Sequence, residues 1–298
     1  MKIIFALLFC LIGCQSPREA VSSKPLILVS VEPYVSMVET IAGDAVVAKC
    51  VLPAYVDPHN WEPKQRDLTG YDTAKVWFTI GEGFESPLLK KIRSVNSKIK
   101  AVPLFQNFEP ISASCGHNHD HSHNHDHSHC SFDTHFWLDP LLDIKQARVI
   151  CDTLSKLIPE KAPIFEQNFS LLKEKLTRMD ETFQSSLKPF KNKILVTSHG
   201  AYTYFCKRYN LRQLVIEPNE GKEPRPKDLT LLISTLNKEH ADILGIYTQP
   251  QHSNKAAKIL AEALAVPMYS VDPYKINYLE TMVLLETYLT SPHANAHH

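Results

Sequence analysis

The stretch PEKAPIFEQNFSLLKEKLTRMDETFQSSL, from Pro159 to Leu187, decides how the rest of the chain is organised. Its apolar residues recur every three or four positions, so they share one face of a helix. They are Phe165, Phe169, Leu172, Leu176, Met179, Phe183 and Leu187. Pro159 suits a first helical turn and Pro189 a stop. We predict one long helix over residues 159–188. It could be a core helix of a single domain, but we favour a rigid connector between two halves.

Short β-branched runs alternate with polar or helix-like sequence on both sides of this helix. Such alternation predicts βα units with parallel sheets, and therefore an α/β fold. The runs before the helix are PLILVSV, VVAKCVL and KVWFTIG, and those after it are KILVTS, LRQLVIE, ADILGIYT and VPMYSVD. We expect an N-terminal α/β lobe over residues 25–158 and a C-terminal α/β lobe over residues 189–298.

Composition narrows the function. The 298 residues, 44% of them hydrophobic, can bury one large core or two ordinary ones. Lys and Arg number 32 and so do Asp and Glu, which leaves no basic excess for tracking nucleic acid. Histidine is out of proportion at 15 residues, and neutral imidazole binds transition metals. Composition thus argues against a nucleic-acid partner and points to metal.

The first residues, MKIIFALLFCLIGC, combine a basic start with an apolar run too short to span a bilayer. They end in Leu-Ile-Gly-Cys, which resembles a bacterial lipobox with lipidation at Cys14. We expect a lipoprotein signal peptide over residues 1–13, a tether over 14–24, and membrane contact only through the lipid anchor. An ordinary secretory signal with an incidental cysteine is the alternative.

The segment CGHNHDHSHNHDHSHC, residues 115–130, carries no apolar residue between its cysteines and predicts a solvated loop. Seven of its residues are candidate accessory metal ligands: His117, His119, His121, His123, His125, His127 and His129. In one interpretation the loop collects zinc for the cleft or senses zinc abundance through its occupancy. In another it is a metal-binding insertion without a transport role. Cys115 and Cys130 bracket it, so a disulfide between them is a hypothesis, with thiolate ligation of metal as its rival.

Four widely separated residues suit one buried metal site. In parallel α/β sheets, ligands gather past the carboxyl ends of strands. His59 follows VVAKCVL in a turn-rich segment, His199 ends KILVTSH, and Asp272 ends VPMYSVD. His135 lies in THFWLDP, just after the histidine-rich segment. Three histidines and one carboxylate form a plausible four-ligand Zn²⁺ site.

Four motifs carry a family resemblance: DPHNWEPKQRD, THFWLDP, TSHGAYTYFCKRYNL and PMYSVDPY. In order and spacing they resemble the signature segments of the metal-specific solute-binding proteins of bacterial ABC transporters, the zinc and manganese uptake family that includes ZnuA. A histidine-rich segment between the first and second motifs is usual in the zinc branch. The resemblance runs from about Leu26 to the C-terminus.

This resemblance implies two Rossmann-like lobes joined by one long helix, with the metal in the interlobe cleft. His59 and His135 would be ligands from the N-terminal lobe, and His199 and Asp272 from the C-terminal lobe. It also implies a partner ABC permease with its ATPase, and a place in the periplasm or cell envelope. We expect a monomer.

The chain departs from the family pattern in two places. Pro58 stands where some zinc members have an acidic residue, and Thr248 or Gln249 replaces the usual glutamate of another segment. His252 stands where an apolar residue is common, and is interpreted as a surface residue or an extra ligand. Relatives with glutamate at the position of His199 tend toward manganese, so His199 favours zinc.

Three acidic residues near the ligand histidines are candidates for orienting imidazoles through the second ring nitrogen: Asp57, Glu62 and Asp139. They could equally cap helices. Glu220 could reach a metal only if its loop folds inward.

The preferred function is a non-enzymatic, extracytoplasmic zinc-binding protein that delivers Zn²⁺ to an import permease. The same role for Mn²⁺ or Fe²⁺ is one alternative. A periplasmic zinc hydrolase is another, although HExxH and GxSxG motifs are both missing. A surface adhesin of the same fold is the third.

Overall fold

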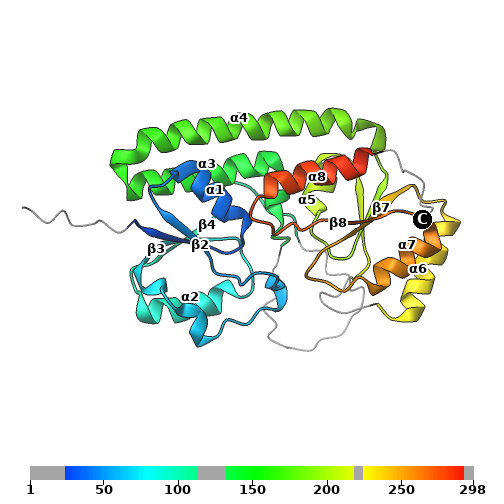
Figure 1. The fold of residues 1–298 in the computed structure, drawn as a ribbon, viewed down its shortest axis with the longest axis horizontal. Helices are drawn as coiled ribbons and strands as arrows, with labels where there is room; N and C mark the ends of the chain where they lie inside the picture. The colour runs from blue at the N-terminus through cyan, green and yellow to red at the C-terminus, as the bar shows by residue number, and fades with distance from the viewer. Residues whose placement is uncertain (1–23, 113–131, 218–223, 292–298) are drawn as a thin grey trace, which may run out of the picture.

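The computed structural model describes residues 24–112, 132–217 and 224–291. The signal peptide, Cys14, Glu220 and the histidine-rich segment with its two cysteines lie outside the described residues. Within them, the chain forms two α/β halves that lie side by side, with one long helix running along both (Figure 1).

The N-terminal half is built on a parallel sheet of strand order β2-β1-β3-β4. Its strands are β1 (Leu26–Val29), β2 (Val47–Cys50), β3 (Ala74–Thr79) and β4 (Lys100–Pro103). Its helices are α1 (Pro33–Ala42), α2 (Glu85–Val95) and α3 (Pro140–Leu157). Sequence patterning predicted the first three strands and missed β4, because the sequence KAVP is short and only half-buried at its centre.

The C-terminal half repeats the plan, with a parallel sheet of order β6-β5-β7-β8. Its strands are β5 (Ile194–Thr197), β6 (Arg212–Val215), β7 (Ile243–Thr248) and β8 (Met268–Ser270). Its helices are α5 (Thr203–Arg208), α6 (Pro226–Lys238), α7 (Lys255–Leu264) and α8 (Tyr278–Thr290). Every residue of β5 and β7 is buried, which explains their continuous apolar runs. The predicted α/β class with two parallel sheets is confirmed.

The long helix α4 (Ala162–Ser186) lies between the two halves in sequence and contacts both. It begins three residues later than predicted, because Pro159–Lys161 form a separate 3-10 turn. Near its start, the side-chain amide of Asn168 donates to the carbonyl of Ile41 in α1 at 3.0 Å. Near its end, Phe183 packs edge-on against Phe205 and Tyr209, with ring centroids 6.2 and 5.6 Å apart. The helix therefore braces the N-terminal half against the C-terminal half.

Direct contacts also join the two halves. Trp137 Nε1 donates to the carbonyl of Pro273 at 2.9 Å, and Arg208 pairs with Asp139 across the same boundary. The larger hydrophobic core cluster of the described residues contains buried residues of both halves. A hydrophobic interface of this kind opposes relative motion of the two halves. Of the residues that the structure describes, none belongs to a helix with both the length and the apolar character of a membrane span.

Candidate metal centre

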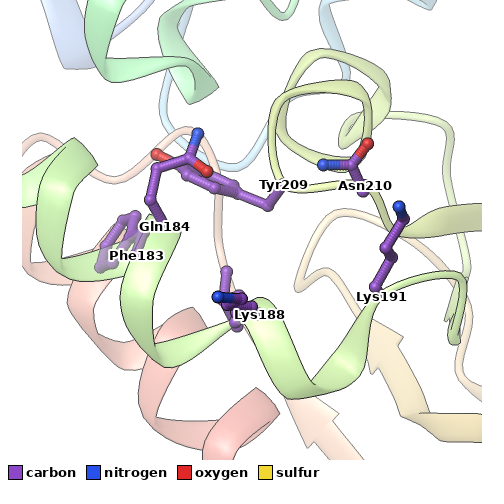
Figure 2. A pocket seen from close by; sticks show the side chains of 7 residues that line it. Phe183, Gln184, Lys188, Lys191, Tyr209 and Asn210 are labelled. Carbon is purple, nitrogen blue, oxygen red and sulfur yellow. The ribbon is translucent and has the colours of Figure 1, made fainter.

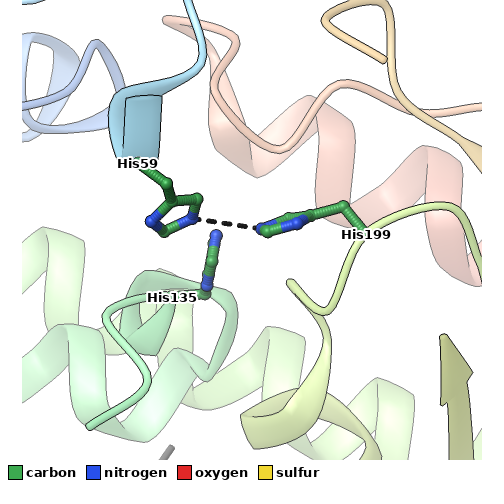
Figure 3. A group of neighbouring side chains, drawn as sticks. All are labelled: His59, His135 and His199. Carbon is green, nitrogen blue, oxygen red and sulfur yellow. Dashed lines mark hydrogen bonds between the residues drawn. The ribbon is translucent and has the colours of Figure 1, made fainter. Parts of the chain in front are cut away.

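Three histidines from distant parts of the chain meet where the two halves face each other. One nitrogen from each of His59, His135 and His199 lies within 4.8 Å of the other two (Figure 3). The Nε2 atoms of His59 and His199 are 3.1 Å apart. Two nitrogens on one tetrahedral Zn²⁺ stand about 3.3 Å apart at bond lengths of roughly 2.0–2.1 Å. The His59–His199 pair therefore already has about the spacing that a shared zinc ion requires.

His59 is held by two carboxylates. It lies in the short 3-10 helix Pro58–Asn60, which Asp57 caps by accepting from the backbone N–H of His59 at 3.0 Å. The ring is fixed by Glu82, whose Oε2 lies 3.2 Å from Nδ1. Glu82 is buried and also accepts from the hydroxyl of Thr134. Although burial raises the pKa of Glu82, its contacts with His59 and Thr134 lower it to about 2, so the carboxylate is ionised.

Gly81 allows Glu82 to take this position. Strand β3 ends just before it, and Gly81 turns the chain with φ +94, in the left-handed region. A Cβ at this residue would lie 2.5 Å from the ring of Phe132. Any other residue type would therefore be strained at this position.

His135 is held through its own local sequence. Asp133 Oδ1 accepts from the backbone N–H of His135 at 2.9 Å and contacts Nδ1 of its ring at 2.8 Å. Carboxylates at the Nδ1 atoms of His59 and His135 favour the tautomer with a proton on that nitrogen. The lone pairs of these two imidazoles then lie on Nε2.

His199 comes from the C-terminal half, two residues after β5. Burial, with smaller contributions from His135, His59 and His252, holds the pKa of His199 well below its usual value. The imidazole is therefore neutral at neutral pH and can offer a lone pair to a metal. His252 stacks on it, with ring centroids 5.0 Å apart and an angle of 9° between the planes.

The carboxylates of Glu82 and Asp133 contact the imidazole rings of His59 and His135. Of the three acidic residues considered from the sequence, Asp57 and Asp139 act as helix caps, which was the alternative role. Glu62 is exposed. Asp57 accepts from the backbone N–H of His59 and so caps the 3-10 helix that carries this histidine. Asp139 caps α3 by accepting from the N–H groups of Leu141 and Leu142.

The two missed carboxylates had signals in the sequence. Glu82 follows the strand KVWFTIG, so the strand-end reasoning that selected His199 applies to it as well. Asp133 stands two residues before His135, within reach of the same ring.

The structure does not bring Asp272 into the group of three histidines. Its Oδ1 accepts from the side-chain amide of Gln251 at 2.9 Å and from the backbone N–H of Tyr274 at 3.0 Å. His252 is also outside the group, but the interpretation of this histidine as a surface residue is wrong. Its side chain is 5% exposed and lies 3.8 Å from the carboxylate of Glu217, which is equally buried.

A separate hollow of about 280 Å³ opens where α4 ends (Figure 2). Its lining includes Phe183, Lys188, Lys191, Tyr209 and Asn210, and none of the three histidines. The three histidines therefore lie outside this hollow and form a compact cluster of imidazoles of their own.

Comparison with known proteins assigns the chain to a family. The model of the family "Zinc-uptake complex component A periplasmic", ZnuA, matches residues 27–298, which is nearly the whole chain. The chain belongs to this family. The resemblance inferred from the four motifs is confirmed, and the family consists of solute-binding proteins that bind zinc.

Individual relatives agree. A putative metal-binding protein of Chlamydia trachomatis is 29% identical over 96% of this chain and 98% of its own length. The zinc-binding lipoprotein AdcA of Streptococcus pneumoniae is 26% identical over 88% of this chain, which spans about half (52%) of AdcA. A crystal structure of ZnuA, 26% identical, superposes with a TM-score of 0.80 over 91% of this chain and all of its own. A ZnuA deletion variant with zinc bound superposes at 0.78, again 26% identical, over 91% of this chain and 98% of its own.

Proposed function

We propose that this protein captures Zn²⁺ outside the cytoplasm with His59, His135 and His199 and delivers it to an ABC import permease. The observation that supports this most strongly is the convergence of three imidazoles from both halves of the molecule, those of His135 and His199 in buried residues. Each half supplies part of the site, so a bound ion adds contacts between the halves. The permease can then distinguish loaded from empty protein by their relative position.

The ligand chemistry supports zinc over the alternatives. Imidazole nitrogens in a tetrahedral arrangement suit Zn²⁺, whereas Mn²⁺ prefers more oxygen ligands and higher coordination. The three ligand atoms of the cluster are all nitrogens. We therefore propose Zn²⁺ as the transported ion, with Mn²⁺ and Fe²⁺ binding more weakly.

A binding role is supported over hydrolysis. A zinc hydrolase needs a carboxylate base that is available to a metal-bound water. Glu82 and Asp133 contact the Nδ1 atoms of His59 and His135 and so are engaged in holding those rings. This engagement, together with family membership, supports a non-catalytic protein.

We propose that Cys14 is lipidated and tethers the protein to the membrane, where a permease can be reached. The naming of the relative AdcA as a lipoprotein supports this.

We also propose that the histidine-rich segment collects zinc for the site. Its flanks support that role: Ser112 and Phe132 pair as an antiparallel bridge, and Asp133, the next residue, holds His135.

Metal content and competition test the main proposal. Protein purified without chelators should carry one tightly held zinc in a variant that lacks residues 116–129. The metal-free form of this variant should take up Zn²⁺ in preference to Mn²⁺ and Fe²⁺ when the three compete. Manganese or iron displacing zinc at equal concentration would refute zinc as the cargo. Additional zinc equivalents in the full chain, lost on deletion, would support accessory binding by the segment, and unchanged stoichiometry would refute it.

A further inference from the structure

The hydroxyl of Tyr274 contacts the metal-facing nitrogen of one ligand histidine. It lies 2.8 Å from Nε2 of His135. Tyr274 is buried, with 7% of its surface exposed, and follows β8 in the C-terminal half, whereas His135 belongs to the N-terminal half. The contact therefore crosses between the halves at a ligand atom.

The direction of this hydrogen bond follows from the other side of the ring. Asp133 lies 2.8 Å from Nδ1 of His135, which places the ring proton there. Nε2 then carries one lone pair in the plane of the ring and no proton. Tyr274 O–H must donate to this lone pair, which is the same one that a zinc ion would need.

The phenol is held in place by its surroundings. Its backbone N–H donates to Oδ1 of Asp272 at 3.0 Å, and the preceding carbonyl, of Pro273, accepts from Trp137 Nε1 at 2.9 Å. The rings of Trp137 and Tyr274 pack with centroids 5.4 Å apart. Water could also hydrogen-bond to Nε2, but it would have to be immobilised each time, whereas the tyrosine hydroxyl is already positioned.

We propose that Tyr274 is a built-in competitor of zinc for Nε2 of His135, which moderates the affinity of the site and speeds release of the ion. As zinc leaves, the hydroxyl of Tyr274 again donates a hydrogen bond to Nε2 of His135, and this bond links the two halves. Asp272 acts in this scheme by positioning Tyr274 through its backbone rather than by binding the ion. The inference rests on the proposed zinc-binding function and names the residue that tunes it.

Substitution Tyr274→Phe tests the competition, because it removes the hydroxyl and leaves the ring that packs on Trp137. Zinc affinity, measured by competition with a chelating dye, should rise about two- to tenfold, the worth of one neutral hydrogen bond. Zinc dissociation into excess chelator should slow by a similar factor. In the metal-free protein, the ¹⁵N resonance of His135 Nε2 should move toward that of an imidazole nitrogen without a hydrogen bond.

Tyr202→Phe is the matched control. Tyr202 follows His199 by three residues and is fully buried. Its hydroxyl has no hydrogen-bond partner among the described residues, so its removal should leave zinc affinity unchanged. Weaker zinc binding in Tyr274→Phe would overturn the proposal and make the hydroxyl a ligand. Unchanged affinity and release would overturn it as well. A loss of at least a hundredfold in Asp272→Asn would show that this carboxylate binds the ion and would also contradict the scheme.

The failure of this inference and the failure of the proposed function can be told apart. If His59→Ala and His135→Ala keep tight zinc binding, the site itself is wrong. If both lose it while Tyr274→Phe behaves like the parent protein, only the role of Tyr274 fails.

Discussion

The carboxylate of Glu82 should be required for tight zinc binding although it does not touch the ion. We predict that Glu82→Gln weakens zinc binding 10- to 100-fold while the protein stays folded. Glutamine has nearly the same shape and can still accept from Nδ1 of His59 through its carbonyl oxygen. Glutamine lacks the negative charge of glutamate. That charge polarises the imidazole of His59 and would attract a zinc ion bound on the other side of the ring.

The magnitude lies between two estimates. A hydrogen bond to a charged group contributes about 1.5–3 kcal/mol and a neutral one about 0.5–1.5, so losing the charge costs about 1 kcal/mol or more. A Zn²⁺ ion on Nε2 of His59 would lie roughly 7 Å from the carboxylate, where Coulomb attraction amounts to about 5 kcal/mol at an effective dielectric constant of 20. Desolvation of the buried anion reduces the latter figure. A loss of about 1.4–2.8 kcal/mol, or 10- to 100-fold, falls between these limits.

Competition with a chelating dye at pH 7 measures the effect, and far-UV circular dichroism checks the fold. Glu62→Gln is the control, because Glu62 lies much nearer to His59 in sequence than Glu82 does but is exposed. It should bind zinc like the parent protein. The reasoning is refuted if Glu82→Gln retains full affinity while His59→Ala loses it, or if both glutamine variants weaken binding equally.

Three further predictions concern the other half of the site, pH and the connecting helix. His199→Ala should abolish tight zinc binding, whereas His252→Ala, measured by the same dye competition, should stay within about tenfold of the parent, because His252 stacks on the site without joining the group of ligand atoms. Burial raises the pKa of Glu85 from 4.5 to about 7. At a pH between these two values, the folded protein keeps the proton on Glu85, whereas the unfolded chain has released it. This difference stabilises the folded state at low pH, and the free energy of unfolding falls by at most about 3 kcal/mol as pH rises through about 7. Urea unfolding at pH 5 and pH 8 should show this loss of stability in the parent protein and not in Glu85→Gln. An equal change in the free energy of unfolding between the two pH values in both proteins would contradict the prediction. Phe183→Ala should lower the free energy of unfolding by about 3–5 kcal/mol because it opens a cavity under α4, while Leu171→Ala on the exposed face of the helix should change it by less than about 0.5. Similar losses in both would show that α4 does not brace the halves through Phe183.

Much of the fold could be predicted because the relevant patterns are local. The apolar spacing from Phe165 to Leu187 indicates a helix wherever the chain goes afterwards, and the β-branched runs indicate buried strands. Strand β4 was missed because its residues Lys100–Pro103 carry no such pattern, and it forms because Val76 to Thr79 of β3 offer it a partner. The start of α4 was placed too early because a proline permits a first turn without distinguishing a 3-10 turn from an α-helix.

The convergence of the three histidines could also be predicted, since residues that follow the ends of parallel strands collect at one edge of each sheet. Which residues share the ion depends on distances of a few ångströms between segments far apart in sequence. Sequence separation carries no information at that scale. The structure brings His59, His135 and His199 together, leaves Asp272 beside Tyr274, and buries His252 against His199.

By itself, the sequence determined that this protein is a two-part α/β chain with a long helix and an excess of histidine, because periodicity and composition are properties of neighbouring residues. Only the tertiary structure decided which carboxylates hold the imidazoles and which hydroxyl meets a ligand nitrogen. Those contacts arise where the two halves are pressed together by a shared core, and no local pattern specifies the resulting positions.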